Sequence, residues 1–152
     1  MKKSILILVV LLGALSVKSQ FVMKMEMKVA IEGICDKDEV YALFSSFDDQ
    51  DEAVCPINEE ELEKKLNSEI KFLKENKKFK SKKGVINLII NCKGELIQSE
   101  MSNTTGSKEL DKQLEDFFNS LGEWSAGKLD GKPVDSTRLI GFKIKKGILK
   151  LN

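Results

Sequence analysis

Three cysteines are the residues of this 152-residue chain whose chemistry is easiest to name. Cys35, Cys55 and Cys92 lie far apart, and no pair has the two-residue spacing of a redox motif. In an exported protein they predict one structural disulfide and one free thiol. A helix over 58–76 rises about 28 Å and a strand over 84–91 returns about 26 Å. Because these lengths nearly cancel, we predict the pair Cys55–Cys92 in preference to Cys35–Cys55, with Cys35 as the free thiol.

Carboxylates occur in two runs, at 48–52 and at 59–61, and either could serve acid–base chemistry or metal binding. The chain has no histidine, which removes histidine-based triads, histidine-ligated metals and the commonest general base. The first run lacks the glycine and the carboxylate positions of a calcium loop. The second is typical of a helix start. We therefore predict a protein that is not an enzyme and that uses no cofactor or metal.

The N-terminus has the layout of a secretory signal peptide. Lys2 and Lys3 precede an apolar run over 5–17, and small residues precede Gln20. A membrane-spanning helix needs about 20 apolar residues, more than this run contains. We predict a signal peptide over 1–19, cleavage near Ser19 and Gln20, and a periplasmic or secreted protein.

Charge argues against nucleic acid as a partner. The whole chain carries 25 basic and 24 acidic residues, and the predicted mature chain is slightly acidic. Arg138 is the only arginine, and lysines are poorer at bidentate phosphate recognition. A lysine-rich stretch runs from the end of the 58–76 helix to Lys83, and two interpretations stay open. It is a solvated helix end and linker, or it contacts an anionic polymer of the cell envelope.

The first half of the mature chain predicts a strand followed by two helices. Residues 21–31 alternate apolar and polar, which indicates a half-buried strand and makes its methionines core residues rather than copper ligands. Apolar spacing predicts a short helix over 38–47. The helix over 58–76 begins at Asn58, a good N-cap. Its expected buried residues are Leu62, Leu66, Ile70 and Leu73.

The second half predicts a hairpin, a helix and a long strand. Residues 84–91 are apolar on both faces, which is typical of a central strand, and 95–101 return with a bulge. A helix begins at Ser107, and a strand covers 135–145. The fold class is therefore α+β, an antiparallel sheet with helices packed on one face and an extra N-terminal strand. We divide the chain into the signal peptide, an N-terminal segment over 20–57 and a domain over 58–152.

The order of features over 84–144 resembles the C-terminal domain of TonB-type energy transducers. The positions that carry the resemblance are Gly94, Leu110, Asp111, Trp124, Gly131, Pro133 and Val134. The chain departs from the family at Ala126 and Gly141, where the family usually has proline, and it shows neither the membrane anchor nor the proline-rich spacer. Trp124 has two interpretations, a core residue or a platform on which a ligand stacks.

The resemblance implies that the last strand accepts an extended peptide by β-augmentation. The predicted binding edge consists of Asp135, Ser136, Thr137, Arg138, Leu139, Ile140, Gly141 and Phe142. Alternatively, the strand over 21–31 covers this edge. The leading functional prediction is an exported envelope protein of a Gram-negative bacterium that binds an extended segment of an outer-membrane or periplasmic protein, linked to transport. The alternative is a self-contained structural or assembly protein whose edge is covered or forms a homodimer.

Overall fold

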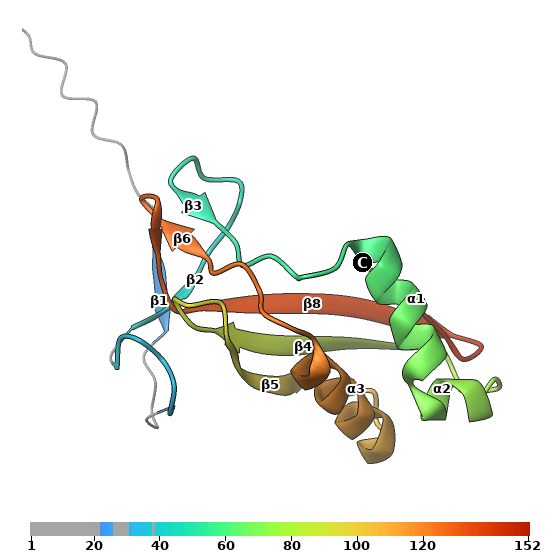
Figure 1. The fold of residues 1–152 in the computed structure, drawn as a ribbon. Helices are drawn as coiled ribbons and strands as arrows, with labels where there is room; N and C mark the ends of the chain where they lie inside the picture. Colours follow the sequence, from blue (N-terminus) through green and yellow to red (C-terminus); the bar gives the residue numbers. More distant parts are fainter. Residues whose placement is uncertain (1–21, 26–30, 38) are drawn as a thin grey trace, which may run out of the picture.

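The computed structural model describes residues 22–25, 31–37 and 39–152 (Figure 1). The predicted signal peptide and most of the 21–31 strand lie outside the described residues. The elements in chain order are β1 (Met23–Met25), β2 (Val40–Ala42), β3 (Gln50–Asp51), α1 (Glu59–Glu69), α2 (Lys71–Glu75), β4 (Lys82–Ile90), β5 (Leu96–Asn103), α3 (Lys108–Ser120), β6 (Lys128–Leu129), β7 (Lys132–Pro133), β8 (Ser136–Lys145) and β9 (Ile148–Leu151).

The chain has the α+β class, and its main sheet is built on the long pair β4 and β8. Within the described residues the strand order is β1-β2-β8-β4-β5, and β9 also pairs with β8. All neighbours are antiparallel except β2 and β8, which run parallel. A smaller sheet, β3-β6-β7, forms beside it. The sheet is thus mixed rather than purely antiparallel. The parallel strand, β2, belongs to the N-terminal segment over 20–57 and not to the predicted domain over 58–152.

The helices pack on one face of the main sheet. Leu88 and Ile90 of β4 and Phe142 and Ile144 of β8 point to this face and are at most 1% exposed. They share one core with buried residues of α1, α2 and α3, namely Leu62, Leu66, Ile70, Leu73, Leu110, Leu114, Phe117 and Phe118. The four residues predicted as the buried row of the 58–76 helix are therefore confirmed. None of the helices in the described part of the chain is long and apolar enough to cross a membrane.

The predicted helix starts are confirmed by their caps. The backbone N–H of Glu61 donates to the Asn58 side chain at 2.9 Å, and that of Leu110 donates to the Ser107 hydroxyl at 3.3 Å. The first helix does not run to residue 76, however. It ends at Ile70, whose backbone is extended (φ −66°, ψ 107°), and α2 then begins.

Two further predictions concern strands. The bulge expected in the return strand of the hairpin is confirmed, because the β4–β5 register shifts between Ile89 and Ile90. The helix predicted over 38–47 is wrong. Residues Val40–Ala42 form β2, which lies between β1 and β8. Pairing with two strands buries Val40 completely, and this outweighs the helical spacing of its neighbours.

Candidate functional site

The outer side of β8, opposite β4, is divided into three parts. At its start, Ser136 and Thr137 pair with Tyr41 and Ala42 of β2. At its end, the stretch from Phe142 to Lys145 pairs with β9. Between these two partners lie Arg138, Leu139, Ile140 and Gly141. The predicted edge over 135–142 is therefore covered at both ends, and its middle forms a window between two short strands.

Leu139 presents its backbone groups to this window. Along a strand the N–H and C=O groups of successive residues point to alternate sides. The carbonyls of Asp135 and Gly141 accept N–H groups from Tyr41 (2.9 Å) and Asn152 (3.0 Å), both on the outer side. Leu139 lies an even number of residues from both Asp135 and Gly141, so its N–H and C=O also point to the outer side of β8. Its side chain is 62% exposed.

The alternative cover, the strand predicted over 21–31, does not lie on this edge in its described part. Residues Met23–Met25 form β1, which pairs with β2 on the side away from β8. The chain's own covers of β8 in the described part are β2, where the sequence predicted a helix, and β9, for which the sequence predicted no strand.

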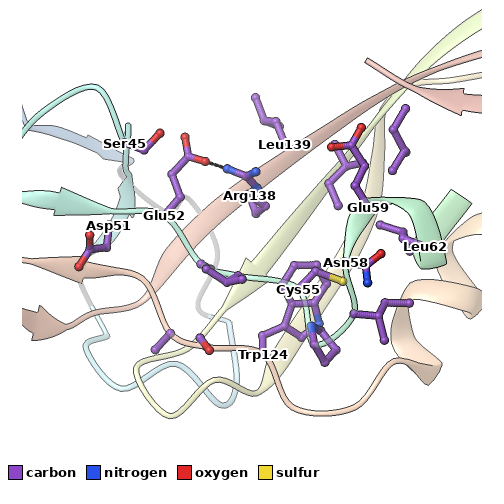
Figure 2. A pocket seen from close by; sticks show the side chains of 18 of the residues that line it. Ser45, Asp51, Glu52, Cys55, Asn58, Glu59, Leu62, Trp124, Arg138 and Leu139 are labelled. Carbon is purple, nitrogen blue, oxygen red and sulfur yellow. Dashed lines mark ion pairs between the residues drawn. The ribbon is translucent and has the colours of Figure 1, made fainter.

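A cleft of about 790 Å³ opens at the window. Arg138, Leu139, Ile140 and Gly141 of β8 line it, and the segment 51–59, which joins β3 to α1, forms the facing wall. Figure 2 shows this wall from Asp51 to Glu59, and Trp124 also lines the cleft. The volume falls within the range of about 300–1,000 Å³ that is usual for ligand clefts.

The facing wall is held away from β8 by its own partners. Val54 and Ser125 exchange both backbone hydrogen bonds at 3.0 Å, so this wall pairs with the loop after α3. Glu52 reaches back across the cleft and forms an ion pair with Arg138 (Figure 2). Burial lowers the pKa of the Arg138 guanidinium from its ordinary value. The cleft thus contains a compensated charge pair at one end and apolar side chains at the other.

Trp124 lies in the core, as one of its two interpretations proposed, and also borders the cleft. It is 4% exposed, and its backbone N–H donates to the Gly94 carbonyl at 2.9 Å. Gly94 has φ +86°, and a Cβ there would lie 2.1 Å from the Trp124 carbonyl oxygen, so only glycine fits. Within the described residues the indole Nε1 has no hydrogen-bond partner. An unsatisfied buried donor is costly to the folded protein.

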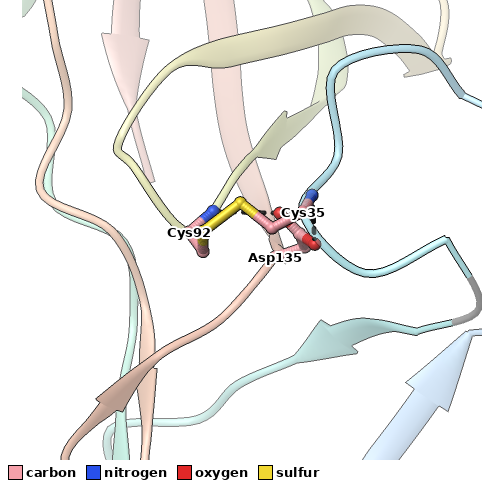
Figure 3. A group of neighbouring side chains, drawn as sticks. All are labelled: Cys35, Cys92 and Asp135. Atoms are coloured by element: carbon pink, nitrogen blue, oxygen red, sulfur yellow. Dashed lines mark hydrogen bonds between the residues drawn. A yellow bond between two sulfur atoms is a disulfide. The ribbon is translucent and has the colours of Figure 1, made fainter.

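The disulfide joins Cys35 to Cys92, so the predicted Cys55–Cys92 pair is wrong (Figure 3). The prediction failed because the helix is shorter than its pattern. The eleven residues of α1 rise only about 17 Å, while the nine residues of β4 span about 30 Å. Cys92 is therefore carried past Cys55 to the far end of the sheet, where the 31–37 loop lies.

Cys55 is the free thiol, and it lines the cleft. Burial raises the pKa of this thiol, while a backbone hydrogen bond at Ile57 lowers it to a smaller degree. The thiolate is therefore disfavoured. Cys55 packs against the core as a small apolar side chain rather than as a nucleophile.

Asp135 ties the disulfide to the start of β8. Its carboxylate is 2% exposed and accepts three backbone N–H groups, from Cys35 (2.8 Å), Asp36 (2.7 Å) and Cys92 (2.9 Å). The two sulfur atoms lie close to this carboxylate, but they are bonded to each other and so are not thiolate metal ligands (Figure 3). The arrangement is a structural clamp that holds the 31–37 loop and β2 against β8.

The other positions that carry the resemblance are structural. Leu110 is fully buried, and the Asp111 carboxylate accepts from the N–H and hydroxyl of Thr105 at 2.9 and 2.6 Å. Gly131 has φ +73° in the turn of the β6–β7 hairpin. Pro133 ends that hairpin rather than starting the long strand, and the N–H of Val134 donates to the Gly127 carbonyl.

Sequence reasoning missed the facing wall of the cleft and the clamp at Asp135. Pro56 favours extended backbone at Cys55, so an extended segment before α1 was predictable. Its position beside β8 was not, because Val54 finds its partner, Ser125, about 70 residues later.

Comparison of the chain with protein-family models, with curated proteins and with solved structures found no match.

Proposed function

We propose that this protein binds a short extended segment of another envelope protein by adding it as a strand to the window of β8. The observation that carries the proposal is the gap on the outer side of β8 between the partners of Thr137 and Gly141, where Leu139 offers one N–H and one C=O. Strand addition uses such groups for affinity and nearby pockets for side-chain selection. The resemblance to the C-terminal domain of TonB-type transducers supports the same mode of binding and a link to transport.

The chemistry of the cleft favours a segment with mixed character. The half-buried Ile140 and Cys55, which both pack against the core, suit an apolar residue of the visitor. The ion pair of Glu52 and Arg138 at the other end of the cleft suits polar groups of the visitor. Without histidine or a thiolate-stabilising environment at Cys55, we assign no catalytic step to this cleft.

An exported location is part of the proposal. The Cys35–Cys92 disulfide is compatible with an oxidising compartment such as the periplasm or the medium. The basic and apolar N-terminal residues supply the sequence signature of export.

A second candidate function follows from the two ends of the window. Because β2 and β9 already occupy most of the outer side of β8, the fold also suits a self-contained scaffold. In that case the window pairs with a second copy of the chain, and the product is a homodimer.

Site-specific photocrosslinking in secreting cells tests the proposal. A photoreactive residue replaces Lys128, which lines the cleft, and in a control it replaces Lys132, which is exposed on β7 and outside the cleft. Each is combined with Leu139→Pro, which removes the N–H in the window, or with Leu139→Ala, which keeps it. Loss of one hydrogen bond lowers the adduct yield roughly tenfold in the proline variant, and the alanine variant keeps most of it.

The outcomes separate the candidates. An adduct with another envelope protein, formed from position 128 and sensitive to proline, supports strand addition. An adduct of two copies of the chain supports the scaffold. An adduct that forms equally from position 132, or that ignores the proline, would refute docking at the window.

A further inference from the structure

A lysine-rich surface lies at the end of the molecule opposite β3 and the disulfide (Figure 1). Two stretches build it, residues 71–83 around α2 and residues 143–150 around the β8–β9 turn. The first contains seven lysines and the second four, against Glu75 as the one acidic residue in both. We call this surface the basic end.

The fold brings the two stretches into contact. Gly147 in the β8–β9 turn has φ +73°, and a Cβ there would lie 2.9 Å from the Lys77 Cα and 3.0 Å from the Leu73 carbonyl. In the sheet, Lys83 stands directly opposite Lys143. Like charges at opposed positions of a strand pair are destabilising. The fold therefore concentrates lysines at a cost to its own stability, which is typical of a functional surface.

Most of these lysines are uncompensated. Lys71 pairs with Glu75 (3.7 Å) and Lys150 with Glu63 (2.7 Å). The other nine are exposed and form no ion pair within residues 22–25, 31–37 and 39–152. They are Lys74, Lys77, Lys78, Lys80, Lys82, Lys83, Lys143, Lys145 and Lys146.

An apolar side chain stands beside them. Ile148, the residue after the β8–β9 turn, is 56% exposed and pairs in register with Lys145. A cationic surface around an exposed apolar side chain is the pattern of proteins that rest on a bilayer. Lysine is a mobile point charge that suits a field of headgroups, whereas recognition of a single phosphate favours arginine forks. The basic end contains no arginine.

We propose that the basic end docks the protein on the anionic headgroups of a lipid bilayer, with Ile148 entering the headgroup region. The window of β8 lies between the two ends of that strand, so docking leaves the cleft accessible. This surface is independent of the segment-binding function.

Vesicle co-sedimentation of the protein recovered after secretion tests this surface. One set of vesicles contains phosphatidylglycerol and phosphatidylcholine in equal parts, and the other contains phosphatidylcholine alone. The test variant carries Lys83→Glu, Lys145→Glu and Lys146→Glu. The matched control carries Lys64→Glu, Lys93→Glu and Lys132→Glu, which are equally exposed but lie outside the basic end. A further variant, Ile148→Ser, removes the apolar contact alone.

The protein binds the phosphatidylglycerol vesicles and not the pure phosphatidylcholine vesicles. Each lysine near the surface contributes roughly fivefold to affinity, so loss of three weakens binding about 100-fold, and the introduced glutamates weaken it further. The control triple variant weakens binding by less than about tenfold, and Ile148→Ser weakens it several-fold. Binding disappears in about 1 M salt, where the Debye length is about 3 Å. Equal binding to both vesicle types, equal losses in the two triple variants, or no binding to phosphatidylglycerol would overturn the proposal.

Discussion

The outer sides of the long strands β5 and β8 are closed in different ways. The free side of β5 faces α3, where the Met101 N–H donates to the Glu115 carboxylate at 3.1 Å and the Ser99 hydroxyl donates to the Glu115 carbonyl at 3.2 Å. The outer side of β8 is closed by β2 and β9, which stop short of each other at Leu139. Proteins cover exposed edges because unpaired backbone groups invite association. The difference indicates that α3 seals β5 at Ser99 and Met101, whereas β8 is left with a limited opening at Leu139.

The largest effect is expected at the β2 end of the window. The double variant Cys35→Ser and Cys92→Ser removes a disulfide that links residues 57 apart, and the chain-entropy model gives a loss of about 4 kcal/mol in the free energy of unfolding. The 31–37 loop and β2 are then held less firmly, so the Tyr41 amide exchanges faster with solvent. Urea unfolding measures the loss. Cys55→Ser is the control, and an equal loss there would contradict the assigned pairing.

The Asp135 clamp gives the next effect. Asp135→Asn leaves one oxygen to serve three backbone N–H groups and places a donor against the others. The expected loss is about 2–3 kcal/mol of unfolding free energy, because a buried charged acceptor is removed. Asp48→Asn, in an exposed loop, changes it by less than about 0.5 kcal/mol. A loss at Asp135 no larger than that at Asp48 would show that the clamp does not hold β2 in place.

At the sealed edge the effect is smaller and local. Glu115→Ala leaves the Met101 N–H without its acceptor and lowers the unfolding free energy by about 1 kcal/mol. The Met101 amide then exchanges faster with solvent, because its N–H is unpaired like that of Leu139 in β8. Asn119→Ala, exposed on the same helix, is the control. Unchanged exchange at Met101 would mean that Glu115 does not seal this edge.

The smallest effect concerns the β9 end of the window. The hydrogen bond from Lys150, and then that from the Leu151 N–H at 2.8 Å, lower the pKa of Glu63 below its ordinary 4.5. A carboxyl whose pKa is lowered on folding stabilises the protein above its unfolded pKa, and loses this effect as pH falls through the folded value. We therefore expect the free energy of unfolding of Glu63→Gln to be lower than that of the unchanged protein by about 0.5 kcal/mol at about pH 6, where solvent screening keeps the effect small. At about pH 3 we expect no difference, and unfolding at the two pH values measures both. The same difference at both pH values would show that the ionised Glu63 carboxylate does not hold β9 in place.

Local patterns in the sequence predicted the parts of the fold that local interactions decide. The caps at Asn58 and Ser107, the buried row of α1 and the central position of β4 follow from propensity and periodicity. The break at Ile70 was not predicted, because its apolar spacing continues unbroken into α2. One such break was enough to misplace Cys55 and with it the disulfide.

The candidate site was predicted only as a strand. Residues 136–142 do form the start and middle of the long strand β8, and Asp135 directly precedes it, but its covers come from Val40–Ala42 and Ile148–Leu151, which are distant in sequence. Such pairings are decided by tertiary contacts that a single strand pattern does not encode. The position of the cleft wall at Glu52 and Cys55 likewise depends on a pairing between residues distant in sequence, Val54 and Ser125.

Native-state amide exchange of the isolated protein tests whether the outer side of β8 is open at Leu139. We predict that the Leu139 N–H exchanges much faster than that of Ile140, which points toward β4, and faster than that of Met101 at the sealed edge. Protection of Leu139 equal to that of Ile140 in a monomer would show that the opening in β8 does not exist.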